Sequence, residues 1–168
     1  MAKPDKPKRS TYDRALDMLE ARGRSVAELR RLLIRKGEPT EDVDAAIERL
    51  RASGLLDDAN YARQLTRSKV LGAGLSKRRI QQELTKRGVA RELSADAIDT
   101  VFEEESIDEA ESIERVARKK LRTLTKLDAP TRRRRLYGFL ARRGFDADDI
   151  GRVLRALDSA AAELAHEE

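Results

Sequence analysis

The amino-acid sequence predicts an all-α protein built from three tandem three-helix repeats, which stack into an elongated and curved array. Charged residues make up 40% and aromatic residues 4% of the 168 residues, a composition that disfavours a β-sandwich. Apolar residues recur at helical spacing along the chain, and no period-2 strand or Asn-Gly or Asp-Gly hairpin turn interrupts them. The same apolar positions return about every 50 residues, which is typical of stacked helical units.

Start and stop signals divide the chain into nine helices. Ser25 with Glu28 forms a capping box, and Ser76, Pro130 and Asp146 are further helix starts. Helix stops fall at glycines, since glycine tolerates the left-handed conformation that ends many helices. These glycines are Gly23, Gly37, Gly54, Gly72, Gly74, Gly88 and Gly144.

The three units align at offsets of 51 and 56 residues. The positions that coincide are Lys36-Gly37, Arg87-Gly88 and Arg143-Gly144, then Leu29, Ile80 and Leu136, and Leu50, Val101 and Leu157. Because one such unit buries little core alone, stacked neighbours are expected to share a core. The expected organisation is a basic flexible tail over 1–10, repeats over 11–56, 57–106 and 107–158, and an acidic end over 159–168.

Charge is distributed unevenly along the chain. Residues 76–91 carry a net charge of +5 and residues 115–135 carry +9, whereas residues 92–114 hold ten acids and no base. Basic residues gathered on one surface attract phosphate or an acidic protein partner. Pairing of acidic and basic helices within the fold is the alternative interpretation.

The second helix of each unit is expected to be the basic one. With its leucines and isoleucines turned inward, its basic side chains point outward at similar positions in all three units. A row of basic helix faces suits an extended anionic partner, although a surface that is merely polar would look the same. The candidate partner- or DNA-binding residues are Arg30, Arg31, Arg35, Lys77, Arg78, Lys86, Arg132, Arg134, Arg135 and Arg142.

No pattern of residues indicates catalysis. The chain has no cysteine and one histidine, His166 near its C-terminus, so we expect no metal, no cofactor and no enzymatic activity. Asp57 and Asp58 are interpreted as helix-capping residues. Tyr61 and Tyr137 fit a core or rim position better than a base-stacking role. Without a signal peptide or membrane span, a cytoplasmic protein is expected, and a monomer is expected because no apolar stripe is left over to require a partner.

The order and spacing of several short motifs resemble the RecX family of regulatory proteins. The resemblance covers about residues 12–158, and its one departure is Leu75-Ser76, where the family often has a proline after the glycine. The motifs are Gly54-Leu55-Leu56-Asp57-Asp58, Tyr61-Ala62, Gly74, Arg79-Ile80, Glu83-Leu84 and Arg87-Gly88-Val89.

The resemblance implies three tandem three-helix repeats and a regulator that is not an enzyme. It implies a partner, the RecA recombinase filament on single-stranded DNA. RecX proteins are expected to bind in the groove of this filament and to limit its growth, its ATPase activity and strand exchange. Single-stranded DNA is then a partner either directly or through the filament. Two alternatives stay open, a stand-alone DNA-binding protein of helix-turn-helix-like units and a scaffold that docks protein helices.

Overall fold

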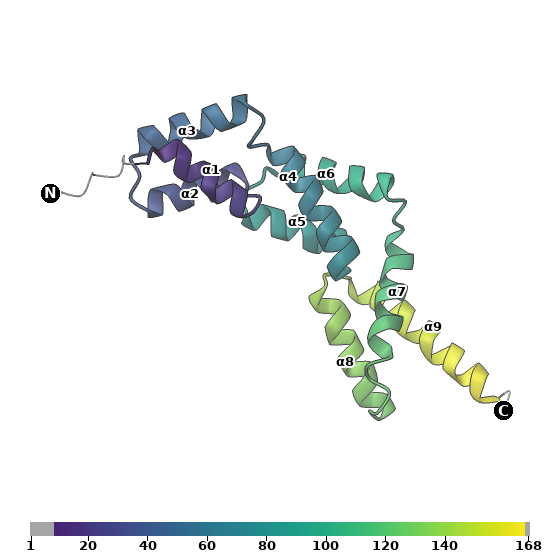
Figure 1. The fold of residues 1–168 in the computed structure, drawn as a ribbon. Helices are drawn as coiled ribbons and strands as arrows, with labels where there is room; N and C mark the ends of the chain where they lie inside the picture. Colours follow the sequence, from purple (N-terminus) through teal and green to yellow (C-terminus); the bar gives the residue numbers. More distant parts are fainter. Residues whose placement is uncertain (1–8, 167–168) are drawn as a thin grey trace.

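A computed structural model describes residues 9–166 of the chain, with side chains as far as residue 160 (Figure 1). Within that range it has nine α-helices, one short π-helix and no strand, which confirms the predicted all-α class. The elements are α1 (Thr11–Ala21), α2 (Val26–Arg35), α3 (Thr40–Ala52), α4 (Asp58–Arg67), η1 (Ser68–Gly72), α5 (Lys77–Lys86), α6 (Arg91–Glu104), α7 (Glu109–Leu121), α8 (Ala129–Arg142) and α9 (Ala147–His166). Residues 1–8 of the expected basic tail and 167–168 of the expected acidic end lie outside the described residues.

The helices group in threes along an elongated, bent row, as predicted. Figure 1 shows α1–α3, α4–α6 and α7–α9 in sequence, with a bend between α5 and α8, and α1 far from the C-terminal end of α9. We call these groups repeats 1, 2 and 3. Of the helices in the described residues, none is both long and apolar enough to cross a bilayer.

Each repeat has a hydrophobic core of its own. The aligned residues Leu29, Ile80 and Leu136 are at most 2% exposed, and each belongs to a different cluster of buried side chains. The expectation of one core shared between neighbours is therefore wrong. The repeats meet through helix ends and polar side chains instead. The three separate clusters show that three helices of this size bury enough apolar surface to form a core of their own.

Most of the predicted helix starts and stops are confirmed. Ser25 and Glu28 form a capping box, and the Ser76 hydroxyl accepts a hydrogen bond from the backbone of its own helix. The predicted left-handed stop at Gly23 is wrong, because α1 ends at Ala21 and the next residue, Arg22, is extended. The one at Gly72 is wrong as well, because Gly72 is the last residue of η1 and has no positive φ. Left-handed glycines in the described residues are Gly37, Gly54, Gly74, Gly88 and Gly144.

The second helix of repeat 3 is longer than its counterparts. By alignment with the starts of α2 and α5, it would begin at Arg133, but α8 begins at Ala129. The Asp128 side chain accepts a hydrogen bond from the Thr131 N–H, and Pro130 lies in the first turn. Proline suits a first turn because its missing N–H would have no helical partner there. These residues add one turn to the N-terminal end of the helix.

Candidate partner-binding surface

The second helices α2, α5 and α8 are joined end to end, in the order α8, α5, α2 (Figure 1). Gly88, just after α5, lies against the first turn of α2, where an added Cβ would overlap the Cβ of Ala27. Gly144, just after α8, lies against the first turn of α5, where an added Cβ would be 2.5 Å from the Cβ of Arg79. The carbonyl end of one helix therefore meets the amide end of the next, which brings opposite partial charges together. We call the three helices the column.

Backbone carbonyls at both joints receive hydrogen bonds from the cap of the next helix. At the first junction, between repeats 1 and 2, the Ser25 hydroxyl donates to the Arg87 carbonyl. At the second junction, between repeats 2 and 3, the Ser76 N–H donates to the Arg143 carbonyl at 3.0 Å. The donors differ because Glu28 already accepts the Ser25 N–H at 3.2 Å in its capping box, whereas α5 has no acid at that position.

A carboxylate completes each joint. Asp58 Oδ1 accepts the Val26 N–H at 2.8 Å, and the aligned Glu109 Oε1 accepts the Lys77 N–H at 2.9 Å. The capping interpretation is confirmed for Asp57, which accepts hydrogen bonds from its own helix, but Asp58 binds the end of another helix. Burial raises the pKa of Asp58, while the hydrogen bond from Val26 works in the opposite direction.

The first junction is closed by a partly buried network around Arg87. The Arg87 guanidinium donates to Glu28 Oε1 and to the Tyr61 hydroxyl, both at 3.2 Å, and Tyr61 donates to Glu28 Oε2 at 3.0 Å. Burial alone would lower the pKa of Arg87, but Tyr61 and Glu28 raise it overall. Burial raises the pKa of Tyr61, and the negative charge of Glu28 adds to that effect. Tyr61 is therefore a structural side chain of the junction.

The second junction has no such carboxylate. Arg143 Nε donates to the Ala73 carbonyl at 2.9 Å, and its guanidinium lies 3.7 Å from the centre of the Phe139 ring. Burial lowers the pKa of Arg143, and the neighbouring Arg142 lowers it further. The position aligned with Glu28 is occupied by Arg79, so the acid that pairs with Arg87 has no counterpart here.

Five of the ten predicted basic residues are exposed cations on the column. Arg35, Lys86 and Arg142 occupy the same position at the C-terminal ends of α2, α5 and α8. Arg134 and Arg135 are exposed on α8. Within the described residues, none of the five forms an ion pair. These side chains are available to an anionic partner.

Two predicted residues are neutralised inside their own repeat. Arg30 Nε lies 2.8 Å from Asp44 Oδ1 on α3. Lys77 Nζ lies 2.7 Å from Asp99 Oδ1 on α6 and 4.8 Å from the centre of the Phe102 ring. Their partners reduce the free positive charge of the column.

The last three predicted residues lie at joints or in a groove. Arg31 reaches the Lys86 carbonyl at 3.5 Å, and Arg78 Nε donates to the Gly144 carbonyl at 3.1 Å. Both side chains remain exposed beside a junction. Arg132 is half-buried between α8 and α9.

A second set of cations lies beside the column and was not among the predicted residues. Arg115, Lys119 and Lys120 on α7 line a groove at the second junction together with Arg143. The high positive charge of residues 115–135 was the only sequence signal for them. They escaped the prediction because it considered only the second helix of each unit, and α7 is the first helix of repeat 3.

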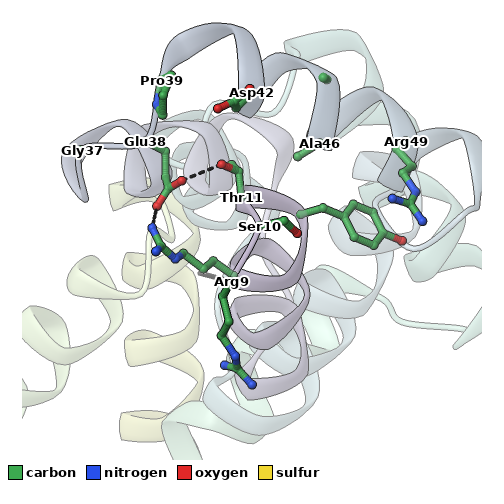
Figure 2. A pocket seen from close by; sticks show the side chains of 12 residues that line it. Arg9, Ser10, Thr11, Gly37, Glu38, Pro39, Asp42, Ala46 and Arg49 are labelled. Atoms are coloured by element: carbon green, nitrogen blue, oxygen red, sulfur yellow. Dashed lines mark hydrogen bonds and ion pairs between the residues drawn. The ribbon is translucent and has the colours of Figure 1, made fainter. Parts of the chain in front are cut away.

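The free end of the column, at α2, is polar. Gly37 has a φ of 85° like Gly88, yet nothing lies within 4 Å of where its Cβ would be. Glu38 is buried there, its Oε2 2.5 Å from the Thr11 hydroxyl and its other oxygen paired with Arg14 (Figure 2). A groove of about 630 Å³ opens beside these side chains. The structure thus has one end of the column uncovered within the described residues.

The fold and the joined helices define a helical tandem-repeat protein with exposed basic side chains along its second helices. Three family models match it in order: the first three-helix domain of RecX over residues 12–50, the second over 57–98 and the third over 107–154. The chain belongs to the RecX family of regulatory proteins, which confirms the resemblance seen in its motifs.

Individual relatives agree with this assignment. The chain is 37% identical over 165 residues to the regulatory protein RecX of Mycolicibacterium vanbaalenii, covering 95% of this chain and 86% of that protein. It is 39% identical over 143 residues to the RecX protein of Mycobacterium avium, covering 83% and 80%. The crystal structure of RecX from Lactobacillus salivarius has the same fold, with a TM-score of 0.69 at 21% identity over 88% of this chain and 94% of that one.

Proposed function

We propose that this protein binds the RecA recombinase filament on single-stranded DNA and restrains its ATPase, its growth and strand exchange. Membership of the RecX family supports this role, together with the resemblance described above. In this proposal the protein is a cytoplasmic regulator without catalytic activity of its own, and it acts as a monomer.

The observation that carries the proposal is the column. Three end-to-end helices carry Arg35, Lys86 and Arg142 at one repeated position along an elongated molecule. Contacts that are weak one at a time become strong together when one rigid body presents them to an extended partner. A filament offers such a partner, because its acidic side chains and phosphates repeat along its length.

A titration of RecA tests the role. Single-stranded-DNA-dependent ATP hydrolysis by the RecA of the same organism is measured as this protein is added. Loss of activity well below one protein per RecA supports binding at filament ends or across several protomers. Loss only near one per RecA supports coating of the groove. No loss, with tight binding to bare DNA in the same buffer, overturns the proposal.

Variants locate the surface that is used. Replacing Arg35, Lys86 and Arg142 by alanine should weaken inhibition, and so should replacing Arg132, Arg134 and Arg135. The control replaces Arg51, Arg91 and Arg152, exposed arginines on the third helix of each repeat. Circular dichroism checks that every variant is folded. If all folded variants inhibited RecA equally, the column would not be the surface that binds the filament.

The free cations of the column also suit direct binding to DNA. A stand-alone DNA-binding protein should hold bare single- or double-stranded DNA tightly, with affinity that falls steeply as salt increases. A filament regulator can bind bare DNA weakly and still act on RecA. Measuring both binding curves over a range of salt concentrations distinguishes the two functions.

A further inference from the structure

The groove at the second junction differs in chemistry from the rest of the surface. It has a volume of about 450 Å³ and lies between η1 of repeat 2 and the helices α7 and α8 of repeat 3. One wall is the chain from Val70 to Gly74, and the other carries the side chains of α7. It therefore exists only where two repeats are joined.

Every charged side chain that lines the groove is positive. They are Arg115, Lys119, Lys120 and Arg143, and no carboxylate lies among the lining residues. Within the described residues none of the four forms an ion pair, although Arg118 on the same helix is paired with Glu114. Four uncompensated cations around one groove favour an anionic ligand.

Two of the four cations, Arg115 and Lys119, have no basic counterpart at the first junction, whereas Lys120 and Arg143 align with Lys69 and Arg87 when α7 is aligned with α4 by their first residues. At the first junction, the positions aligned with Arg115 and Lys119 are Gln64 and Ser68. The position aligned with Phe139 is Glu83, which lies 3.8 Å from the Arg87 guanidinium. The same backbone arrangement thus carries a closed acid–base network at one junction and an open basic groove at the other.

The groove also has an exposed apolar part. Leu71 is 55% exposed in the π-helical turn η1, and Val116 faces the same groove from α7. Short π-helical segments are rare and occur frequently at functional sites. An exposed leucine beside clustered cations fits a ligand that combines negative charge with an aliphatic or aromatic side chain.

The aromatic content of the groove separates two classes of ligand. Single-stranded nucleic acid is usually held by bases stacked on free aromatic rings. Among the lining residues only Phe139 is aromatic, and its ring is already covered by Arg143 at 3.7 Å and approached by Lys120 at 5.3 Å. The remaining apolar surface is aliphatic, which suits a protein side chain better than a base.

We propose that this groove binds an acidic peptide segment of a partner protein. A bulky apolar side chain of the segment packs on Leu71 and Val116, and its flanking carboxylates bind Arg115 and Lys119. Arg143 stays on Phe139 and closes the end of the groove. The inference goes beyond filament regulation, because it concerns a class of ligand and does not depend on RecA.

Fluorescence anisotropy tests the site with the full-length protein. The probe is a fluorescein-labelled peptide of about twelve residues, with a central Leu-Leu pair between runs of aspartate and glutamate. We expect saturable binding that Lys119→Glu weakens at least about tenfold, since it replaces an attractive contact by a repulsive one. The charge-matched control is Lys126→Glu, an exposed lysine outside the groove, which should change the affinity less than about threefold.

The apolar contact has a matched pair of variants as well. Leu71 and Leu55 are both 55% exposed, and only Leu71 lines the groove. Leu71→Ala should weaken binding and Leu55→Ala should not. A control peptide with Ser-Ser in place of Leu-Leu should bind the wild-type protein as weakly as the Leu-Leu peptide binds Leu71→Ala.

Three results would overturn the proposal. The first is no saturable binding of the Leu-Leu peptide to the wild-type protein. The second is equal weakening by Lys119→Glu and Lys126→Glu, which would indicate charge attraction without a site. The third is displacement of the peptide by an oligothymidine of about twelve nucleotides that binds more tightly and also loses affinity in Lys119→Glu, which would assign the groove to nucleic acid. Circular dichroism confirms that each variant is folded.

Discussion

The two junctions use the same backbone arrangement with opposite side-chain chemistry. In both, the left-handed glycine that follows a second helix lies against the first turn of the second helix of the preceding repeat. A carboxylate accepts a hydrogen bond from the first N–H of that earlier helix. Around Arg87 there are two acids and a tyrosine, whereas the aligned Arg143 has an aromatic ring and further cations. The shared part of the joint thus consists of backbone atoms, a glycine and one carboxylate, which leaves the other surrounding positions free to differ between the two junctions.

The largest effects should come from the glycines that make the joints. In Gly37→Ala the added Cβ meets no other atom, so the only cost is that of placing alanine in a left-handed conformation. This should reduce the free energy of unfolding by about 1 kcal/mol. Gly88→Ala and Gly144→Ala add a collision with the neighbouring helix, so each should reduce the free energy of unfolding by about 2–4 kcal/mol. Urea unfolding followed by circular dichroism measures all three. Equal losses at Gly37 and Gly144 would mean that the close approach contributes nothing.

The network at the first junction should be next in size. Arg87→Met leaves the partly buried Glu28 with only its longer ion pair, 3.5 Å from the exposed Arg22, and should reduce the free energy of unfolding by about 1–3 kcal/mol. Arg51→Met removes an exposed pair with Glu48 and should cost less than about 0.5 kcal/mol. Thermal unfolding of the two variants gives the comparison. A loss at Arg87 no greater than at Arg51 would contradict the importance assigned to the network.

The second junction should be less sensitive to loss of its arginine. Arg143→Met leaves no carboxylate unpaired and gives up the contact with Phe139 and one hydrogen bond, so we expect a loss of about 1 kcal/mol. The measurement is the same thermal unfolding as for Arg87→Met. A larger loss for Arg143→Met than for Arg87→Met would reverse the proposed division between a structural and a binding junction.

The smallest expected effect is a pH dependence at Asp58. Because burial raises the pKa of folded Asp58 above the usual value for an aspartate, Asp58 favours folding below its unfolded pKa, and this contribution is lost as pH rises through the folded pKa. Asp58→Asn keeps an oxygen for the Val26 N–H and removes the charge. The variant should therefore gain stability relative to wild type between about pH 4 and 6, by about 0.5 kcal/mol or less after solvent screening. If the difference in the free energy of unfolding between Asp58→Asn and wild type were the same at every pH in that range, the effect of the variant would not come from the titration of Asp58.

The sequence predicts the helices well because their signals are local. The Ser25–Glu28 capping box and the glycine stops at Gly88 and Gly144 act within a few residues of the chain. The exposed cations Arg35, Lys86 and Arg142 were found because they repeat. Gly23 and Gly72 mislead, since α1 turns directly into extended backbone at Arg22 and Gly72 continues the helical path as the last residue of η1.

What the sequence does not reveal depends on contacts between distant segments. The acids that neutralise Arg30 and Lys77 lie on the third helices of their repeats. The apolar pattern does not determine which polar side chains of a third helix face the second helix. The groove cations Arg115 and Lys119 meet η1 only after two repeats are joined. The shared core was wrongly expected because apolar spacing shows which face is buried but not against which neighbour.

The additional turn of α8 determines how such an array can grow by gene duplication. In the two existing joints, a glycine of the later repeat packs on the first turn of the earlier second helix. At α8 the additional turn occupies that place, so a fourth repeat added after residue 158 could not form the same joint. At Gly37 the corresponding end is open within the described residues, and the backbone already has the required conformation. Lengthening of this architecture is therefore expected at its beginning rather than at its end.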